Sequence, residues 1–173
     1  MADYSFVTIW RHRAPIEDVY AAIADARSWP EWWPTVKRVE GVAPGDPATG
    51  LGMVQRFTFK GSLPYTLSFD MTVTRIEKPR LLAGHATGEL EGDGVWTLTE
   101  EPGGVTVTRY DWNIRTTRWW MNLLAPLARG VFKANHDIVM RAGAKGLCDR
   151  LGGVSGTCEW LNEGATEPAG AAG

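Results

Sequence analysis

This sequence of 173 residues lacks any long hydrophobic run. No apolar stretch approaches the ~20 residues that a membrane-spanning helix needs. The opening residues, MADYSFVTIW, have neither the positive n-region nor the apolar h-region of a secretory signal. We therefore expect a protein with no membrane span, located in the cytoplasm.

Cysteine and histidine are scarce as well, with two and three residues respectively. Cys148 falls near the end of a predicted helix and Cys158 in a polar segment, so no disulfide framework is indicated and neither residue fits a metal-ligand pattern. Gly-rich phosphate loops, paired histidine ligands and Gly-x-Ser-x-Gly turns are absent. Gly50-Leu51-Gly52 and Gly92-Asp93-Gly94 are interpreted as hairpin turns. We expect no cofactor and no metal.

An excess of charge of either sign is missing too. Lys and Arg number 18 against 20 Asp and Glu, for a net charge of -2. Proteins that bind phosphate backbones normally carry a basic surface. The composition therefore argues against nucleic acid as a partner.

Tryptophan, in contrast, is abundant. The nine indoles lie at positions 10, 29, 32, 33, 96, 112, 119, 120 and 160. Two interpretations stay open, a Trp-rich core or a pocket lined by large flat side chains that suits apolar or ring-bearing ligands.

The N-terminal third predicts one strand and two short helices. Residues 4–12 alternate as in a strand, and a short amphipathic helix follows Pro15. Ser28-Trp29-Pro30-Glu31 has the form of a capping box, which predicts a second, very short helix that Pro34 closes. This helix carries Trp29, Trp32 and Trp33, which we expect to close one end of a cavity.

The middle of the chain predicts an antiparallel meander with strands near 36–42, 52–60, 65–77, 80–88, 94–100 and 104–115. The clearest alternation runs through 65–74, where every second side chain is apolar. We expect the curved inner face of the sheet to contain Phe57, Phe59, Leu67, Phe69 and Met71.

The strand near 104–115 is ambiguous because its apolar phase changes. Val105 and Val107 share a face with Arg109, Asp111 and Asn113, whereas Tyr110, Trp112 and Ile114 occupy the other. Either a bulge reverses the strand or both faces are partly covered. Arg109 and Asp111 could pair toward the cavity as a polar anchor or form a solvent-facing salt bridge.

Residues 118–151 predict a long helix, kinked or restarted at Pro126. Its expected apolar stripe contains Leu124, Leu127, Val131, Ala134 and Ile138, and a neighbouring stripe continues through Met140, Gly143, Leu147 and Leu151. We expect one domain over 1–152 and a flexible tail over 153–173, where Gly, Ala, Ser, Thr and Glu dominate.

Four stretches resemble the START-like superfamily, also labelled SRPBCC or polyketide cyclase/dehydrase. They are Ala14 to Tyr20, Trp29 to Pro34, Gly103 to Val107, and Phe132 to Asp137 with Met140 and Gly146-Leu147. The resemblance covers about residues 3 to 151. It implies an α+β helix-grip fold in which a curved seven-stranded antiparallel sheet wraps around a long C-terminal helix, with two short helices between the first two strands. Relatives use the internal cavity for lipids, sterols, ubiquinone-like molecules, plant hormones or polyketide intermediates.

These observations predict a domain, monomeric or weakly dimeric, that binds a hydrophobic small molecule such as a lipid or polyketide-like compound. The candidate ligand-binding residues are Trp32, Trp33, Phe57, Phe59, Tyr65, Leu67, Phe69, Met71, His85, Trp96, Arg109, Asp111, Asn113, Leu127, Val131 and Asn135.

Two alternatives remain. One is a polyketide aromatase/cyclase in which Tyr65, His85, Arg109 and Asp111 position carbonyls and move protons. The other is an interaction module that uses the tail or Trp119-Trp120. His136 beside Asn135 could face the cavity or pack within the helix, and His12 is expected to be solvated.

Overall fold

The computed structural model describes residues 3–117, 125–152 and 158–163, without the side chains of 125–129 and 158–163. Its elements are β1 (Asp3–His12), α1 (Ile16–Ala24), a 3-10 turn (Ala26–Ser28), α2 (Trp29–Trp32), β2 (Val36–Ala43), β3 (Val54–Phe59), β4 (Leu67–Glu77), β5 (Leu81–Gly88), β6 (Leu90–Glu101), β7 (Val105–Thr116), α4 (Ala125–Arg150) and β8 (Cys158–Glu163).

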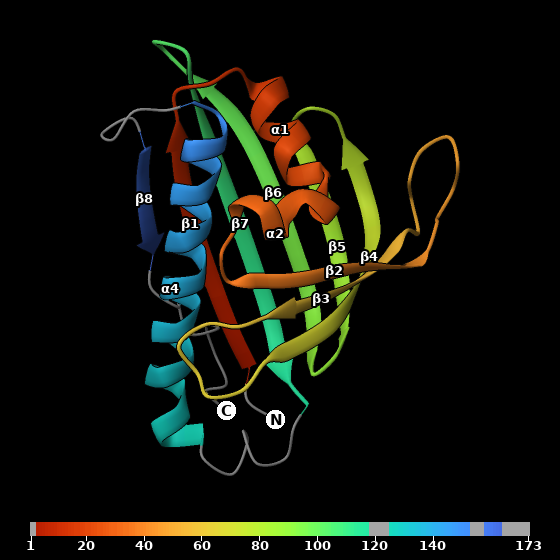
Figure 1. The fold of residues 1–173 in the computed structure, drawn as a ribbon, viewed down its shortest axis with the longest axis vertical. Helices are drawn as coiled ribbons and strands as arrows, with labels where there is room; N and C mark the ends of the chain where they lie inside the picture. Colours follow the sequence, from red (N-terminus) through yellow and green to blue (C-terminus); the bar gives the residue numbers. More distant parts are fainter. Residues whose placement is uncertain (1–2, 118–124, 153–157, 164–173) are drawn as a thin grey trace, which may run out of the picture.

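The strands form one antiparallel sheet in the order β2-β3-β4-β5-β6-β7-β1-β8. Helices α1, α2 and α4 lie over the same curved face of this sheet, with α4 running beside β1 (Figure 1). The predicted helix-grip architecture is confirmed: the seven expected strands, the two short helices between β1 and β2, and the long C-terminal helix are all present. The helix begins at Ala125, so Pro126 lies in its first turn, where proline is tolerated.

The eighth strand comes from the segment predicted as a tail. β8 pairs with β1 from Val7↔Glu163 to His12↔Cys158, and so covers what would otherwise be an open sheet edge. Residues 153–157 and 164–173 lie outside the described residues, so the flexibility of the rest of the tail stays a prediction. Cys148 in α4 is disulfide-bonded, which corrects the view that no disulfide is indicated, and the chain's other cysteine is Cys158.

Tryptophan rings fill much of the core between α2 and the sheet. Trp10 in β1 is fully buried, and its ring centroid lies 5.4 Å from that of Trp33 and 5.2 Å from that of Trp96. Trp29 lies 4.9 Å from Trp33. Large buried aromatic surfaces of this kind contribute strongly to stability. The core interpretation of the tryptophans therefore holds for Trp10.

Glycines in α4 allow this helix to approach α2 closely. A Cβ at Gly143 would lie 2.5 Å from the Trp33 ring, and one at Gly146 would lie 1.7 Å from the carbonyl oxygen of Trp32. The Trp33 indole also donates a hydrogen bond of 2.8 Å to the carbonyl oxygen of Val139. These contacts hold α4 against the end of α2.

Two local predictions are wrong. Ser28 makes no capping hydrogen bond to α2, because it belongs to the preceding 3-10 turn and its hydroxyl donates to the Asp25 carbonyl. His12 is buried and its Nε2 donates to the Ala144 carbonyl at 3.0 Å, because α4 and β8 cover the end of β1. Burial also lowers the pKa of His12.

The buried side of α4 also differs from the predicted stripe. Val131 and Ile138 are exposed, whereas Phe132, Met140, Ala144 and Leu147 are buried. The predicted second stripe, which includes Met140 and Leu147, is thus the inner one. The sequence pattern misled because polar residues at 135 and 136 share the inner side with these apolar residues.

Candidate functional site

An apolar cavity of about 310 Å³ lies between the concave sheet face and helices α1, α2 and α4. Twelve of the lining residues are aromatic: Phe6, Tyr20, Trp29, Trp33, Phe57, Phe59, Tyr65, Phe69, Trp96, Tyr110, Trp112 and Phe132. A concave, mostly apolar space with a few polar groups is typical of small-molecule sites.

Small residues at the centre of the sheet floor leave room for side chains from neighbouring strands, Met71 over Gly84 and Tyr110 and Trp112 over Gly94. Gly84 of β5 pairs directly with Gly94 of β6, and Ala86 pairs with Gly92. A Cβ at Gly92 would lie 2.1 Å from a backbone oxygen of β7, so only glycine fits there. The prediction of a hairpin turn at Gly92-Asp93-Gly94 is wrong, because this segment is the interior of β6, whereas 50–52 does form a turn.

Many residues predicted from the sequence line this cavity. They are Trp33, Phe57, Phe59, Tyr65, Leu67, Phe69, Met71, Trp96 and Asn135. Five of them, Phe57, Phe59, Leu67, Phe69 and Met71, occupy alternate positions on β3 and β4 and so share the inner face, as the period-2 pattern indicated. Their role in ligand binding stays a prediction. Trp32 is buried against Trp29 and Trp33 but does not line the cavity.

Several other predicted site residues point away from the cavity. Arg109 is paired with Asp111 at 2.8 Å on the outer sheet face, and Asn113 there accepts a hydrogen bond from Ser5. The β6–β7 register is unbroken from Leu90↔Thr116 to Glu101↔Val105, so no bulge reverses β7. Both faces of β7 are partly covered instead. Because every second side chain of β7 faces the cavity without interruption, Tyr110, Trp112 and Ile114 point inward.

His85 and Val131 also lie outside the cavity. The His85 side chain is 42% exposed, and its Nδ1 lies 2.8 Å from Asp93 Oδ1 on the outer face. Val131 is exposed on the outer side of α4. The structure therefore does not place these two residues on the cavity lining. The Leu127 side chain and Trp119-Trp120 lie outside what the structure describes.

Buried polar groups that sequence reasoning missed do reach the cavity. Gln55 of β3 is 6% exposed, and Tyr20 of α1 and Tyr110 of β7 also line the space. Burial raises the pKa of the Tyr20 and Tyr110 phenols, so both stay protonated and neutral. Gln55 alternates with Phe57 and Phe59 along one strand, which is the signal that could have identified it.

His136 lies on the cavity side of α4. Its ring stacks on Phe6 with centroids 4.1 Å apart, and its Nε2 is hydrogen-bonded to the Thr8 hydroxyl at 3.3 Å. Burial lowers the pKa of His136 to about 3. The imidazole is therefore neutral near pH 7, and can offer a hydrogen bond but no positive charge. The neighbouring Asn135 accepts a 2.9 Å bond from the Ser62 backbone N–H, which ties the β3–β4 loop to α4.

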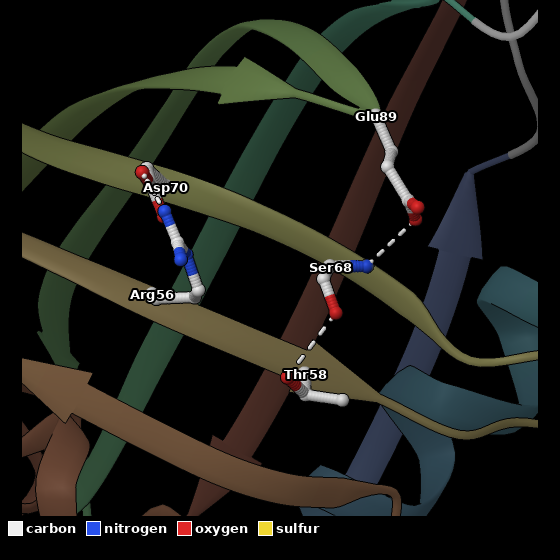
Figure 2. A network of polar contacts seen from close by, with 5 residues as sticks. All are labelled: Arg56, Thr58, Ser68, Asp70 and Glu89. Atoms are coloured by element: carbon white, nitrogen blue, oxygen red, sulfur yellow. Dashed lines mark hydrogen bonds and ion pairs between the residues drawn. The ribbon is translucent and has the colours of Figure 1, made fainter.

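A polar network on the outer face fixes the strands that carry the lining aromatics (Figure 2). Arg56 of β3 makes two hydrogen bonds to Asp70 of β4, of 2.7 and 2.8 Å, and these bonds lower the pKa of the Asp70 carboxyl. Thr58 and Ser68 hydroxyls lie 3.2 Å apart, and the Ser68 N–H donates to Glu89 at 2.8 Å. The network therefore holds Phe57 and Phe69 in register on the opposite face.

No helix among the described residues is long and apolar enough to span a membrane. The arrangement of a curved antiparallel sheet, a long helix across it and an apolar cavity between them defines the helix-grip class.

The chain belongs to the polyketide cyclase/dehydrase and lipid transport family, whose model matches residues 9–152. Similar solved structures include the Zhui aromatase/cyclase from Streptomyces sp. R1128, with a TM-score of 0.71 and 15% identity, over 88% of this chain and 100% of that one. A START superfamily protein from Mycobacterium smegmatis has a TM-score of 0.67 and 12% identity, over 86% and 97% of the two chains.

The di-domain aromatase/cyclase BexL from the BE-7585A biosynthetic pathway has a TM-score of 0.65 and 21% identity, over 86% of this chain and 50% of that chain. This chain thus spans half of that protein. No curated protein matches by sequence. At these identities the likeness to solved structures concerns the fold.

Proposed function

We propose that this protein binds a hydrophobic small molecule inside the cavity beneath α4. The observation that carries the proposal is the cavity of about 310 Å³ with an aromatic lining. Protein interiors are normally packed without voids of this size, and lining atoms beside an empty space lose their dispersion contacts. A ligand would restore those contacts.

A titration monitored by indole fluorescence tests the proposal, because Trp29, Trp33, Trp96 and Trp112 all line the cavity. The panel contains fatty acids, sterols and aromatic polyketide analogues. We expect saturable quenching or a spectral shift with at least one compound class. A flat response across the whole panel would contradict the proposal.

A substitution that fills part of the cavity gives a second test of the proposal. A Cβ at Gly84 would lie 2.6 Å from the Met71 sulfur, which is part of a flexible side chain and would move into the cavity. We expect Gly84→Val to weaken binding by roughly tenfold or more, since core space is lost. Thr87→Val, at an exposed position of the same strand, is the control and should bind as the wild type does.

The second candidate function is a polyketide aromatase/cyclase, which the family and two of the named structural neighbours favour. Because His85, Arg109 and Asp111 lie on the outer face, such chemistry would use His136, Tyr110 or Gln55. Turnover of a poly-β-keto mimic that a His136→Gln variant loses while it still binds ligand would support this activity. The interaction module stays a prediction, because Trp119-Trp120 lies outside the described residues.

A further inference from the structure

The cavity lining includes an amide side chain that makes no hydrogen bond to another residue in the described part of the chain. Gln55 is 6% exposed and lines the cavity, between Gly41 of β2 and Met71 of β4. The outer network uses Arg56 and Thr58 of the same strand, whose side chains lie on the opposite face of the sheet. The amide atoms open onto the cavity, where water or a polar group of a ligand can reach them. An apolar ligand that covered this amide would leave it without a hydrogen bond at a cost, so its position favours a polar group on the ligand.

Tyr110 of β7 contributes a second neutral polar group to the cavity lining. Tyr110 stacks on Trp96 with centroids 4.0 Å apart, and its hydroxyl oxygen lies 2.5 Å from where a Cβ of Gly94 would stand. This hydroxyl has no hydrogen-bond partner among the residues described. Because residue 94 is glycine, the Tyr110 hydroxyl oxygen can occupy the space beside β6 that a side chain at 94 would take.

Charged groups are almost missing from the lining. Among the described residues, the only Lys, Arg, Asp or Glu that lines the cavity is Lys78, which is exposed just after the end of β4. An ionised carboxylate inside the cavity would therefore lack a charge partner, and burying such a group is costly. The polar groups present suit carbonyl and hydroxyl oxygens.

We propose that Gln55 is the polar anchor for a neutral, ring-bearing ligand, and that the cavity rejects ionised acids. The amide NH₂ donates to a ligand carbonyl, or the amide oxygen accepts from a ligand hydroxyl, while the aromatic lining contacts the ring faces. Tyr110 offers a second neutral hydrogen bond. This inference rests on the proposed function and specifies its ligand class.

Three probes of one ring size test it: anthracene, anthraquinone and anthraquinone-2-carboxylate, each titrated by indole quenching. We expect wild-type protein to bind anthraquinone about tenfold more tightly than either other probe, as one additional buried hydrogen bond allows. Gln55→Leu should lose most of this preference, while its affinity for anthracene stays within about threefold or improves. Anthracene binding therefore also reports that the variant is folded.

Tyr110→Phe and Lys78→Met complete the set. We expect the first to reduce the preference for anthraquinone by less than Gln55→Leu does, and the second to leave it unchanged. Equal affinity of the wild type for all three probes, tighter binding of the carboxylate, or an unchanged preference in Gln55→Leu would overturn this inference alone. Failure of these probes and of the whole apolar panel would overturn the proposed function with it.

Discussion

Acid should destabilise this protein through His136, and the size of the effect follows from its surroundings. The imidazole is held between Phe6 and the Thr8 hydroxyl, and burial lowers its pKa from the usual 6.5 to about 3. The unfolded chain therefore binds a proton below pH 6.5 that the folded protein does not bind. Stability from this group is present above pH 6.5 and is lost as the pH falls toward 3.

The shift gives a loss of about 2 kcal/mol in the free energy of unfolding between pH 7 and pH 5. Urea denaturation at pH 7, 6 and 5 measures it, and His136→Gln removes the titrating group. We expect the variant to be about 2 kcal/mol less sensitive to this pH change than the wild type, whatever its stability at pH 7.

The comparison isolates His136 from its neighbours. Burial of His12 produces an acid loss of the same sign, and burial raises the pKa of the Asp137 carboxyl, which acts in the opposite direction. Both contributions are common to wild type and variant and so cancel. His85→Gln, on the exposed outer face, is the control. Equal acid sensitivity of His136→Gln and the wild type would refute the reasoning.

Three further substitutions test the architecture. Glu89→Ala removes the acceptor of the Ser68 N–H and should cost about 1 kcal/mol in urea denaturation; no change would mean that water replaces the carboxylate. Gly146→Ala places a Cβ 1.7 Å from the Trp32 carbonyl oxygen and should cost about 3 kcal/mol or more, or prevent folding, as circular dichroism would show. Arg109→Met, on the outer face, should change neither ligand affinity nor stability by more than about 0.5 kcal/mol; a loss of affinity would contradict its placement.

The fold could be predicted because its strands alternate cleanly where one face is buried and the other is wet. Phe69 and Met71 in β4 are the clearest case, and both line the cavity. The short helix before Pro34 does form, at Trp29–Trp32, although the capping bond from Ser28 that the prediction rested on is absent. The resemblance to the START-like superfamily supplied the cavity, which no single stretch of the sequence reveals.

The polar part of the site was harder to predict. β7 is partly covered on both faces, so Val107 and Trp112 are shielded from solvent on opposite sides and the apolar pattern does not decide which face is inner. Gly92 resembles turn chemistry locally, yet its positive φ occurs inside β6, because the backbone of β7 approaches too closely for a side chain. Gln55 interrupts an apolar face, and its place on the cavity lining becomes visible only in the structure.

β8 could not be predicted because its pairing is long-range. The composition near 158–163 resembles a tail, and only contact with β1 and the disulfide-bonded end of α4 makes it a strand. The cytoplasmic location, the domain boundary at 152 and the monomeric or weakly dimeric state stay predictions.

Native mass spectrometry of freshly purified protein tests the central claim most directly. We predict that the wild type and Thr87→Val carry an additional small-molecule mass that denaturing extraction with organic solvent releases, and that Gly84→Val, with its cavity partly filled, carries much less of it. Wild-type protein found only at the mass of the bare chain, or an equal additional mass on Gly84→Val, would contradict binding in the cavity beneath α4.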